Sequence, residues 1–273
     1  MKKTKGILLV LILISTWISI SFAENGGYST TSSLDWNLFK KYNSMIFIPN
    51  QNGLLTVPIA TTIGKGKIAA GLSSLEAGKI SDTKVYYTNA GILLGTSDDV
   101  EIGYSKKALV FSDDYSRTDI EGANLYLKIK LLDWGDVVPR IAVGLTATSL
   151  TNESDLDKYN TFMNAFAVTS IMFDLFAARI GLHAGLENGF MGDNQGDPFF
   201  FGGATITLFD FINLCGEYVG ANQEGEDGMV NASAGVKLFD ILSINVNQLD
   251  LNNENNKKDP KTSAQAVLSI KFH

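Results

Sequence analysis

The stretch "IEGANLYLKIKLL" at residues 120–132 alternates apolar and polar residues over almost its whole length. Leucine and isoleucine residues occupy one side of the alternation, and Lys128 and Lys130 occupy the other. A helix would scatter these two lysines around its circumference, whereas a β-strand points successive side chains to opposite faces. The stretch therefore predicts a β-strand with one apolar and one polar face.

The same alternation recurs from residue 67 onward, for example in "VPRIAVGLTAT", "ARIGLHAGLE" and "LSINVNQL". The 26 glycines and 5 prolines of the chain fit many strands joined by tight turns. We predict an all-β protein of about twelve strands, at residues 67–75, 84–95, 100–111, 120–132, 137–149, 161–172, 177–188, 199–208, 212–221, 229–238, 241–251 and 262–272.

The links between these strands are alternately short and long. The short ones include "TSDD" and "DWGD" and mostly carry aromatic residues, whereas long ones such as "TNESDLDKYN" and "NQEGEDG" are acidic. This alternation is typical of an antiparallel up-and-down transmembrane barrel whose two ends face different compartments. The aromatic residues then form a ring at the membrane interface, and capping of an ordinary core at the hairpin ends is the alternative.

The N-terminus has the pattern of a secretory signal peptide. Three lysines precede an apolar run at residues 6–20, and Ala23 supplies a small-residue exit, so we expect cleavage after Ala23. An uncleaved anchor, the alternative, needs a longer span. Because no later stretch approaches the roughly 18 residues of a spanning helix, any insertion into a membrane must use strands.

Composition narrows the partners. Cys215 is the only cysteine, so disulfides do not hold the fold together. The net charge of −7 argues against a nucleic-acid partner. Alternation alone allows a soluble, lipocalin-like barrel with an apolar interior, but the even strand number and the signal peptide favour apolar faces turned to outer-membrane lipid.

The last strand is patterned almost to the end of the chain, in "AQAVLSIKFH". In bacterial outer-membrane proteins the barrel-assembly machinery recognises a final strand that ends near an aromatic residue. We therefore predict that Leu268, Ile270 and Phe272 form this assembly signal.

The predicted location is the bacterial outer membrane, with both mature termini in the periplasm. The chain divides into a signal peptide (1–23), a periplasmic leader (24–52) and the barrel (53–273). Within the leader, "SLDWNLFKKY" predicts a short amphipathic helix that plugs the barrel or binds a periplasmic partner, and a disordered leader is the alternative.

Two stretches point to a family. "NGLLTVPIATTIGKGKIAAGL" begins at Asn52 and "GILLGTSDDVEIGY" begins at Gly91. Together they resemble the exopolysaccharide-associated outer-membrane barrels of the YjbH-like type, over about residues 50–105. The resemblance implies a role in polysaccharide secretion, with periplasmic or polysaccharide-export partners. The residues alone have a purely geometric explanation, since glycine permits positive φ and Pro58 fixes an extended approach to the first strand.

If the apolar faces meet lipid, the polar faces line the lumen, and their charged residues are mostly basic. Such a lining favours anions if the lumen is open, whereas pairing of the charges across a narrow interior would seal it. Amides on the same faces, at Asn124, Asn213, Asn231, Asn245 and Gln265, either bind sugar hydroxyls or hydrate the wall. The predicted titratable lumen residues are Lys67, Glu101, Lys107, Lys128, Lys130, Arg140, Arg179, His183, Glu187, Glu217, Lys237 and Lys271.

Catalytic patterns are weak. His183 shares a face with Arg179 and Glu187, but no nucleophile motif accompanies it, and no metal-ligand spacing is present. We therefore predict a protein that is not an enzyme and needs no cofactor. The predicted function is a small channel or the outer-membrane component of an envelope or exopolysaccharide export system. The alternatives are a non-conducting structural or adhesion barrel with acidic outer loops and, third, an outer-membrane lipid hydrolase.

Overall fold

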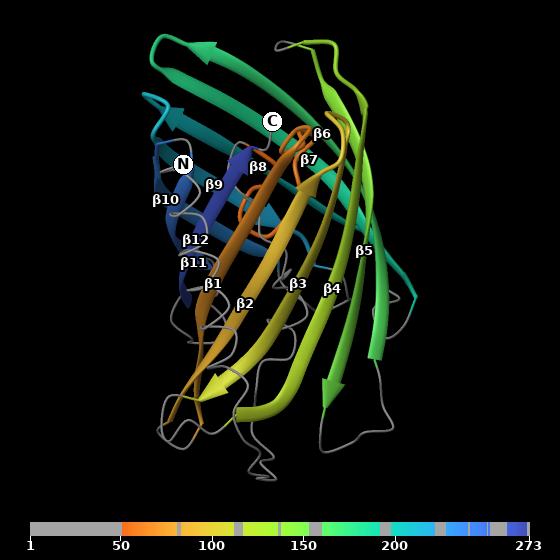
Figure 1. The fold of residues 1–273 in the computed structure, drawn as a ribbon, viewed down its shortest axis with the longest axis vertical. Coiled ribbons are helices and arrows are strands. Elements are labelled where there is room, and N and C mark those ends of the chain that lie inside the picture. Colours follow the sequence, from red (N-terminus) through yellow and green to blue (C-terminus); the bar gives the residue numbers. More distant parts are fainter. Residues whose placement is uncertain are drawn as a thin grey trace, which may run out of the picture.

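Twelve antiparallel strands close into one barrel in the computed structural model of the chain (Figure 1). The structure describes residues 51–80, 83–111, 117–135, 138–152, 160–191, 198–221, 228–239, 241–249, 251 and 261–271. The signal peptide and the leader up to residue 50, including its predicted helix, lie outside the described residues. The strands are β1 (Lys67–Ile80), β2 (Thr83–Gly95), β3 (Val100–Phe111), β4 (Arg117–Leu132), β5 (Arg140–Asn152), β6 (Asn160–Leu175), β7 (Ala178–Met191), β8 (Phe199–Leu208), β9 (Ile212–Val219), β10 (Met229–Leu238), β11 (Leu242–Leu249) and β12 (Lys261–Lys271).

Each strand pairs with the next along the chain, and β12 pairs with β1 to close the barrel. The prediction of an all-β, up-and-down barrel of about twelve strands is therefore confirmed. The seam places Lys67 opposite Lys271, so β1 begins and β12 ends at the same end of the barrel. We call this the short-turn end, because the short links lie there, and the opposite one the long-link end.

The two sides of the barrel differ in height. Strands β1–β7 have 12 to 16 residues, whereas β8–β11 have 8 to 10. Several of these longer strands extend further toward the long links than the alternation of apolar residues predicts. For example, β1 continues to Ile80, because it pairs with β2 beyond a bulge at Glu76 and Gly78. Backbone pairing, which any side chain allows, sets these boundaries.

The outward face of the barrel is apolar. Large side chains such as Ile92, Leu125, Leu182 and Val246 are more than half exposed there. Their neighbours along each strand point inward and are mostly buried and polar. This arrangement is the reverse of a water-soluble barrel and is the one that a barrel in lipid requires.

The aromatic residues of the short turns are exposed rather than packed over a core. Phe176, Phe209, Phe239 and Trp134 are all at least 64% exposed. The three phenylalanines also adopt a positive φ of 53°, which is unusual for bulky residues. Their side chains project from the rim of the barrel, where a membrane interface favours aromatic rings.

No described helix is long and apolar enough to cross a membrane.

Candidate functional site

The segment before β1 lies inside the barrel, where its orange trace can be followed in Figure 1. Residues 51–63, which we call the lumen hairpin, turn back on themselves: Gly53 bridges Pro58, and the amide of Leu54 donates to the carbonyl of Val57 at 2.9 Å. The predicted extended approach through Pro58 is thus a folded hairpin. Its apolar side chains, which include Leu54, Ile59 and Ile63, are almost fully buried in the lumen.

The exit of the hairpin toward β1 is fixed by the short turn between β2 and β3. Gly64 has a φ of 87°, and a Cβ at Gly95 would lie only 1.9 Å from its carbonyl oxygen, so the close approach requires glycine at position 95. Asp98 accepts hydrogen bonds from the amide of Lys65 at 3.0 Å and, through its own carbonyl, from the Thr62 hydroxyl at 2.7 Å. The two stretches that carry the family resemblance therefore contact one another.

A buried ion pair holds the middle of the hairpin. Lys128 Nζ lies 2.9 Å from Glu101 Oε1, and both side chains are fully buried. The same ammonium donates to the carbonyls of Asn52, Ile59 and Thr61 at 2.8, 3.1 and 2.6 Å.

The carboxylate of the pair is satisfied as well, because Glu101 Oε2 accepts from the amide of Ile63 at 2.9 Å. Every charge of the pair is therefore compensated by the partner or by hairpin backbone. Such compensation is what a pair of buried charges needs to offset its desolvation.

A second carboxylate holds the tip of the hairpin. Glu217, on β9, accepts from the amides of Leu55 and Thr56 at 2.9 and 3.0 Å and from the Thr56 hydroxyl at 2.5 Å. Asn231 on β10 donates to the same carboxylate at 2.7 Å. Because Glu217 lies five residues from the start of β9 at Ile212, the tip reaches about 17 Å along the strand from the short-turn end.

His183 also belongs to this middle level. Its ring nitrogens lie 2.8 Å from Ser170 Oγ and 3.1 Å from Thr205 Oγ1, and Ser170 Oγ accepts from the amide of Ala60 in the hairpin at 2.9 Å. A serine beside a histidine is the contact that a nucleophile and its base make. Here Ser170 is fully buried and accepts from the Ala60 amide, so the contact helps to fix the backbone of the hairpin.

The predicted grouping of His183 with Arg179 and Glu187 is not formed. Arg179 donates to Asp174 at 2.8 Å, and Glu187 accepts from Asn164 at 2.8 Å, while His183 faces Ser170. The sequence did not indicate Ser170, because its partner in the hairpin is a backbone amide.

The long-link half of the lumen is filled by the strands themselves. Tyr126 stacks on Phe166 with ring centroids 5.9 Å apart. Lys107 and Glu187 also lie in this half, and both are buried. The apolar side chains that fill it are Leu75, Tyr87, Tyr126, Phe162, Phe166, Phe201, Val219, Met229 and Leu249.

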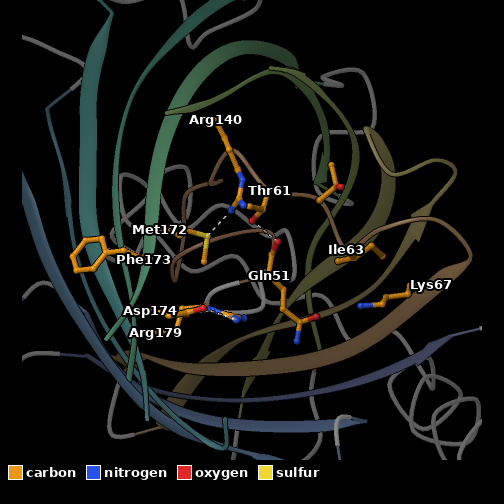
Figure 2. A pocket seen from close by; sticks show the side chains of 10 residues that line it. Gln51, Thr61, Ile63, Lys67, Arg140, Met172, Phe173, Asp174 and Arg179 are labelled. Atoms are coloured by element: carbon orange, nitrogen blue, oxygen red, sulfur yellow. Dashed lines mark hydrogen bonds and ion pairs between the residues drawn. The ribbon is translucent and has the colours of Figure 1, made fainter. Parts of the chain in front are cut away.

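The short-turn end, by contrast, contains a cavity of about 290 Å³, which we call the mouth cavity (Figure 2). Its lining combines the stem of the hairpin, at Gln51, Thr61, Thr62 and Ile63, with the ends of strands, at Lys67, Arg140, Met172, Phe173, Asp174 and Arg179.

Ion pairs surround this cavity. Asp133 lies 2.7 Å from Lys130 Nζ and 2.9 Å from Arg140 Nε. Burial acts to raise the pKa of Asp133, but the hydrogen bonds from these two cations outweigh it and lower the pKa below its usual range. Arg140 also contacts the sulfur of Met172 at 3.2 Å.

All twelve predicted lumen residues are on inward-facing positions, but they fall at three levels of the barrel. Glu101, Lys128 and Glu217 bind the hairpin, with His183 beside them. Lys107 and Glu187 lie beyond it, in the long-link half. The six residues at the short-turn end are Lys67, Lys130, Arg140, Arg179, Lys237 and Lys271.

The lumen amides mostly bond their neighbours in the wall. The pairs are Asn124 with Ser105 and Thr148, Asn213 with Thr207, and Asn231 with Glu217. Asn245 is buried without a hydrogen-bond partner among the described residues. The three bonded amides, Asn124, Asn213 and Asn231, therefore serve the wall and the carboxylate that holds the hairpin.

The predicted assembly strand closes the barrel. Leu268 and Ile270 lie on the outward positions of β12, opposite Ala70 and Ile68 of β1. Phe272 lies outside the described residues. Within the described part of the chain, no group of three histidine, cysteine or acidic residues is placed to hold a metal ion.

No family model and no curated protein matches the chain. Among solved structures, it is similar to the KdgM porin at 10% identity and a TM-score of 0.47, over 76% of this chain and 99% of the porin. It is similar to Omp33 of Acinetobacter baumannii at 7% identity and a TM-score of 0.46, over 76% and 98%. It is also similar to outer membrane phospholipase A of Escherichia coli at 8% identity and a TM-score of 0.43, over 76% and 92%. These likenesses concern the barrel and assign no activity to this chain.

Proposed function

We propose that the chain is a bacterial outer-membrane β-barrel that acts as a closed scaffold of the cell envelope rather than as an open pore. The observation that carries this proposal is the lumen hairpin, whose backbone is bonded by Glu101, Lys128 and Glu217. A role in exopolysaccharide export, with both mature termini in the periplasm, is the narrower form of the proposal and rests on the family resemblance.

A filled lumen favours this reading over the small channel that the basic lining suggested. The charges at the middle level are used for the hairpin, and those in the long-link half are buried among aromatic residues. Ions would meet a desolvated, apolar constriction at this level, which opposes conduction.

Single-channel recording on the refolded mature protein in planar bilayers tests the proposal. We expect no stepwise current from the wild type, nor from a variant that lacks residues 24–63, because Phe166, Tyr126 and their neighbours still fill the long-link half. Stable current through the wild type would contradict a closed scaffold. Current through the deletion variant alone would identify the lumen hairpin as a gate and restore the channel hypothesis.

A gel assay checks the membrane barrel itself. The mature protein should fractionate with the outer membrane and migrate faster unheated than boiled on a denaturing gel. Recovery of the folded protein in the soluble periplasmic fraction would contradict it.

A further inference from the structure

Two lysines face each other across the seam of the barrel. Lys67 of β1 is directly opposite Lys271 of β12, and both occupy inward positions at the short-turn end. Like charges directly opposite on neighbouring strands destabilise a sheet. Neither lysine forms an ion pair with any residue in the described part of the chain. The seam therefore places two like charges together without an acidic partner in the described barrel, and because Lys271 is exposed and Lys67 is half-buried, water screens their repulsion only in part.

Lys67 also lines the mouth cavity, together with Arg140 and Arg179. Figure 2 shows these three cations on different sides of the opening, arranged around Gln51 and Thr61 of the hairpin stem. They come from β1, β5 and β7, which are far apart in the sequence and are brought to one rim by barrel closure. The cations therefore converge on one space.

The acidic residues that line the mouth cavity do not balance the cations that line it. Asp174 is the only acidic residue that lines the described cavity, and it is paired with Arg179. Asp133 is shared between Lys130 and Arg140. The excess charge of the cavity is positive, although the whole chain has a net charge of −7.

The cavity also offers neutral polar groups. Thr61, Thr62 and Gln51 supply hydroxyl and amide groups beside the cations. A volume of about 290 Å³ is at the lower limit of small-molecule sites, so it accommodates a single sugar-sized group rather than a long chain.

We propose that the mouth cavity binds the anionic group of a hydroxylated ligand, such as one acidic sugar unit. Lys67 and the two arginines contact the carboxylate or phosphate, and the hairpin stem contacts hydroxyls. The bound anion also offsets the repulsion between Lys67 and Lys271. The proposal does not depend on whether the barrel conducts.

Calorimetric titration of the refolded mature protein in detergent tests this site. The probes are glucuronate, glucose phosphate and, as a neutral control, methyl glucoside. We expect one or both anionic probes to bind, with affinity that falls as salt is raised. Binding of glucuronate alone identifies a carboxylate ligand, and preference for glucose phosphate identifies a phosphorylated one.

Lys67→Gln should weaken binding of the anionic probe about tenfold, because it removes one charge-assisted hydrogen bond. Lys65→Gln is the matched control, since Lys65 is exposed at the same end but does not line the cavity. Lys67→Arg, which keeps the charge, should bind within about threefold of the wild type. Removing one of two opposed lysines should not impair folding, and migration of the unheated protein on a gel checks this for each variant.

Three results would overturn the proposal. They are the absence of binding by both anionic probes, equal binding of methyl glucoside, and equal weakening by Lys65→Gln and Lys67→Gln. The last would show attraction to a charged rim without a site.

Discussion

The two halves of the lumen are closed in different ways. At the short-turn side, a segment from outside the sheet enters the barrel and is bound through its backbone by Glu101, Lys128 and Glu217. At the long-link side, the strands close the space with their own side chains, as in the stacking of Tyr126 on Phe166. The first half combines directed polar contacts with the buried apolar side chains of the hairpin, whereas the second is closed mainly by packing of strand side chains.

This difference has consequences for specificity. Apolar packing tolerates many combinations of side chains of suitable volume. A buried charge bonded to particular backbone carbonyls accepts only one placement of the segment, since any shift leaves the charge without partners. The charged half should therefore be the more sensitive to single substitutions, and the position of the hairpin should depend on it.

The largest effect is expected from Lys128→Met. This change leaves the Glu101 carboxylate buried and unpaired, so the free energy of unfolding should fall by about 3 to 5 kcal/mol. Urea unfolding of the barrel in lipid vesicles measures the loss. Lys130→Met, on the same face two residues along β4, is the control and should cost about 1 kcal/mol or less, because its ion pairs lie at the exposed rim.

The double variant Glu101→Gln with Lys128→Met removes both charges and should recover part of the loss. Equal destabilisation by Lys128→Met and Lys130→Met would show that the buried pair does not distinguish the two halves.

A smaller effect, about 3 kcal/mol, is expected from Phe166→Ala in the long-link half, because truncation leaves a cavity beside Tyr126. Phe166→Leu, which fills most of the space, should cost about 1 kcal/mol. Amide hydrogen exchange tests whether the two halves open separately. The Thr56 amide, which is bonded to Glu217, should stay protected from exchange in both Phe166 variants. It should lose this protection in Lys128→Met. Loss of Thr56 protection in Phe166→Ala would mean that the two halves open together.

The smallest effect is expected at the rim. Asp133 has a lowered pKa in the folded protein, so its pairing with Lys130 and Arg140 adds stability above the unfolded pKa and loses it as the pH falls through the folded value. Asp133→Asn should cost about 0.5 kcal/mol at pH 7, because exposed pairs contribute little. The difference from wild type should begin to shrink near pH 4, about the unfolded pKa, and vanish only below the folded pKa, which is lower. Urea midpoints at several pH values measure this, and a constant difference down to pH 3 would contradict it.

The strands and their inward and outward faces could be predicted from the sequence. Apolar and polar residues alternate with a period of two, and this period matches the alternation of side chains between the two faces of a sheet. Lys128 and Ile129 are assigned to opposite faces by their spacing alone, and the structure places Lys128 inside and Ile129 on the exposed outer face. The short turns could also be located, because their composition interrupts the alternation.

The lumen hairpin could not be predicted in the same way. Its partners are main-chain amides and carbonyls, which every sequence has, so nothing at Glu101 or Glu217 marks these residues as ligands of a segment far away in the chain. One clue was present: "LLTVPIA" is apolar but too short to be a membrane span, and such a stretch needs a place to be buried. The prediction of an extended segment leading to the first strand gave these apolar side chains no place to be buried.

The lumen hairpin has a further consequence for the order of assembly. Thr56 and Glu217 are 161 residues apart, and the hairpin runs directly into β1, the strand that closes the seam with β12. Contacts so distant in sequence form slowly, because the intervening chain must first be ordered. We therefore expect the strands to assemble around the hairpin, which precedes them in the chain, rather than the hairpin to be threaded into a closed barrel. Seating of the hairpin and pairing of β1 with β12 are thus both expected to be late steps of assembly.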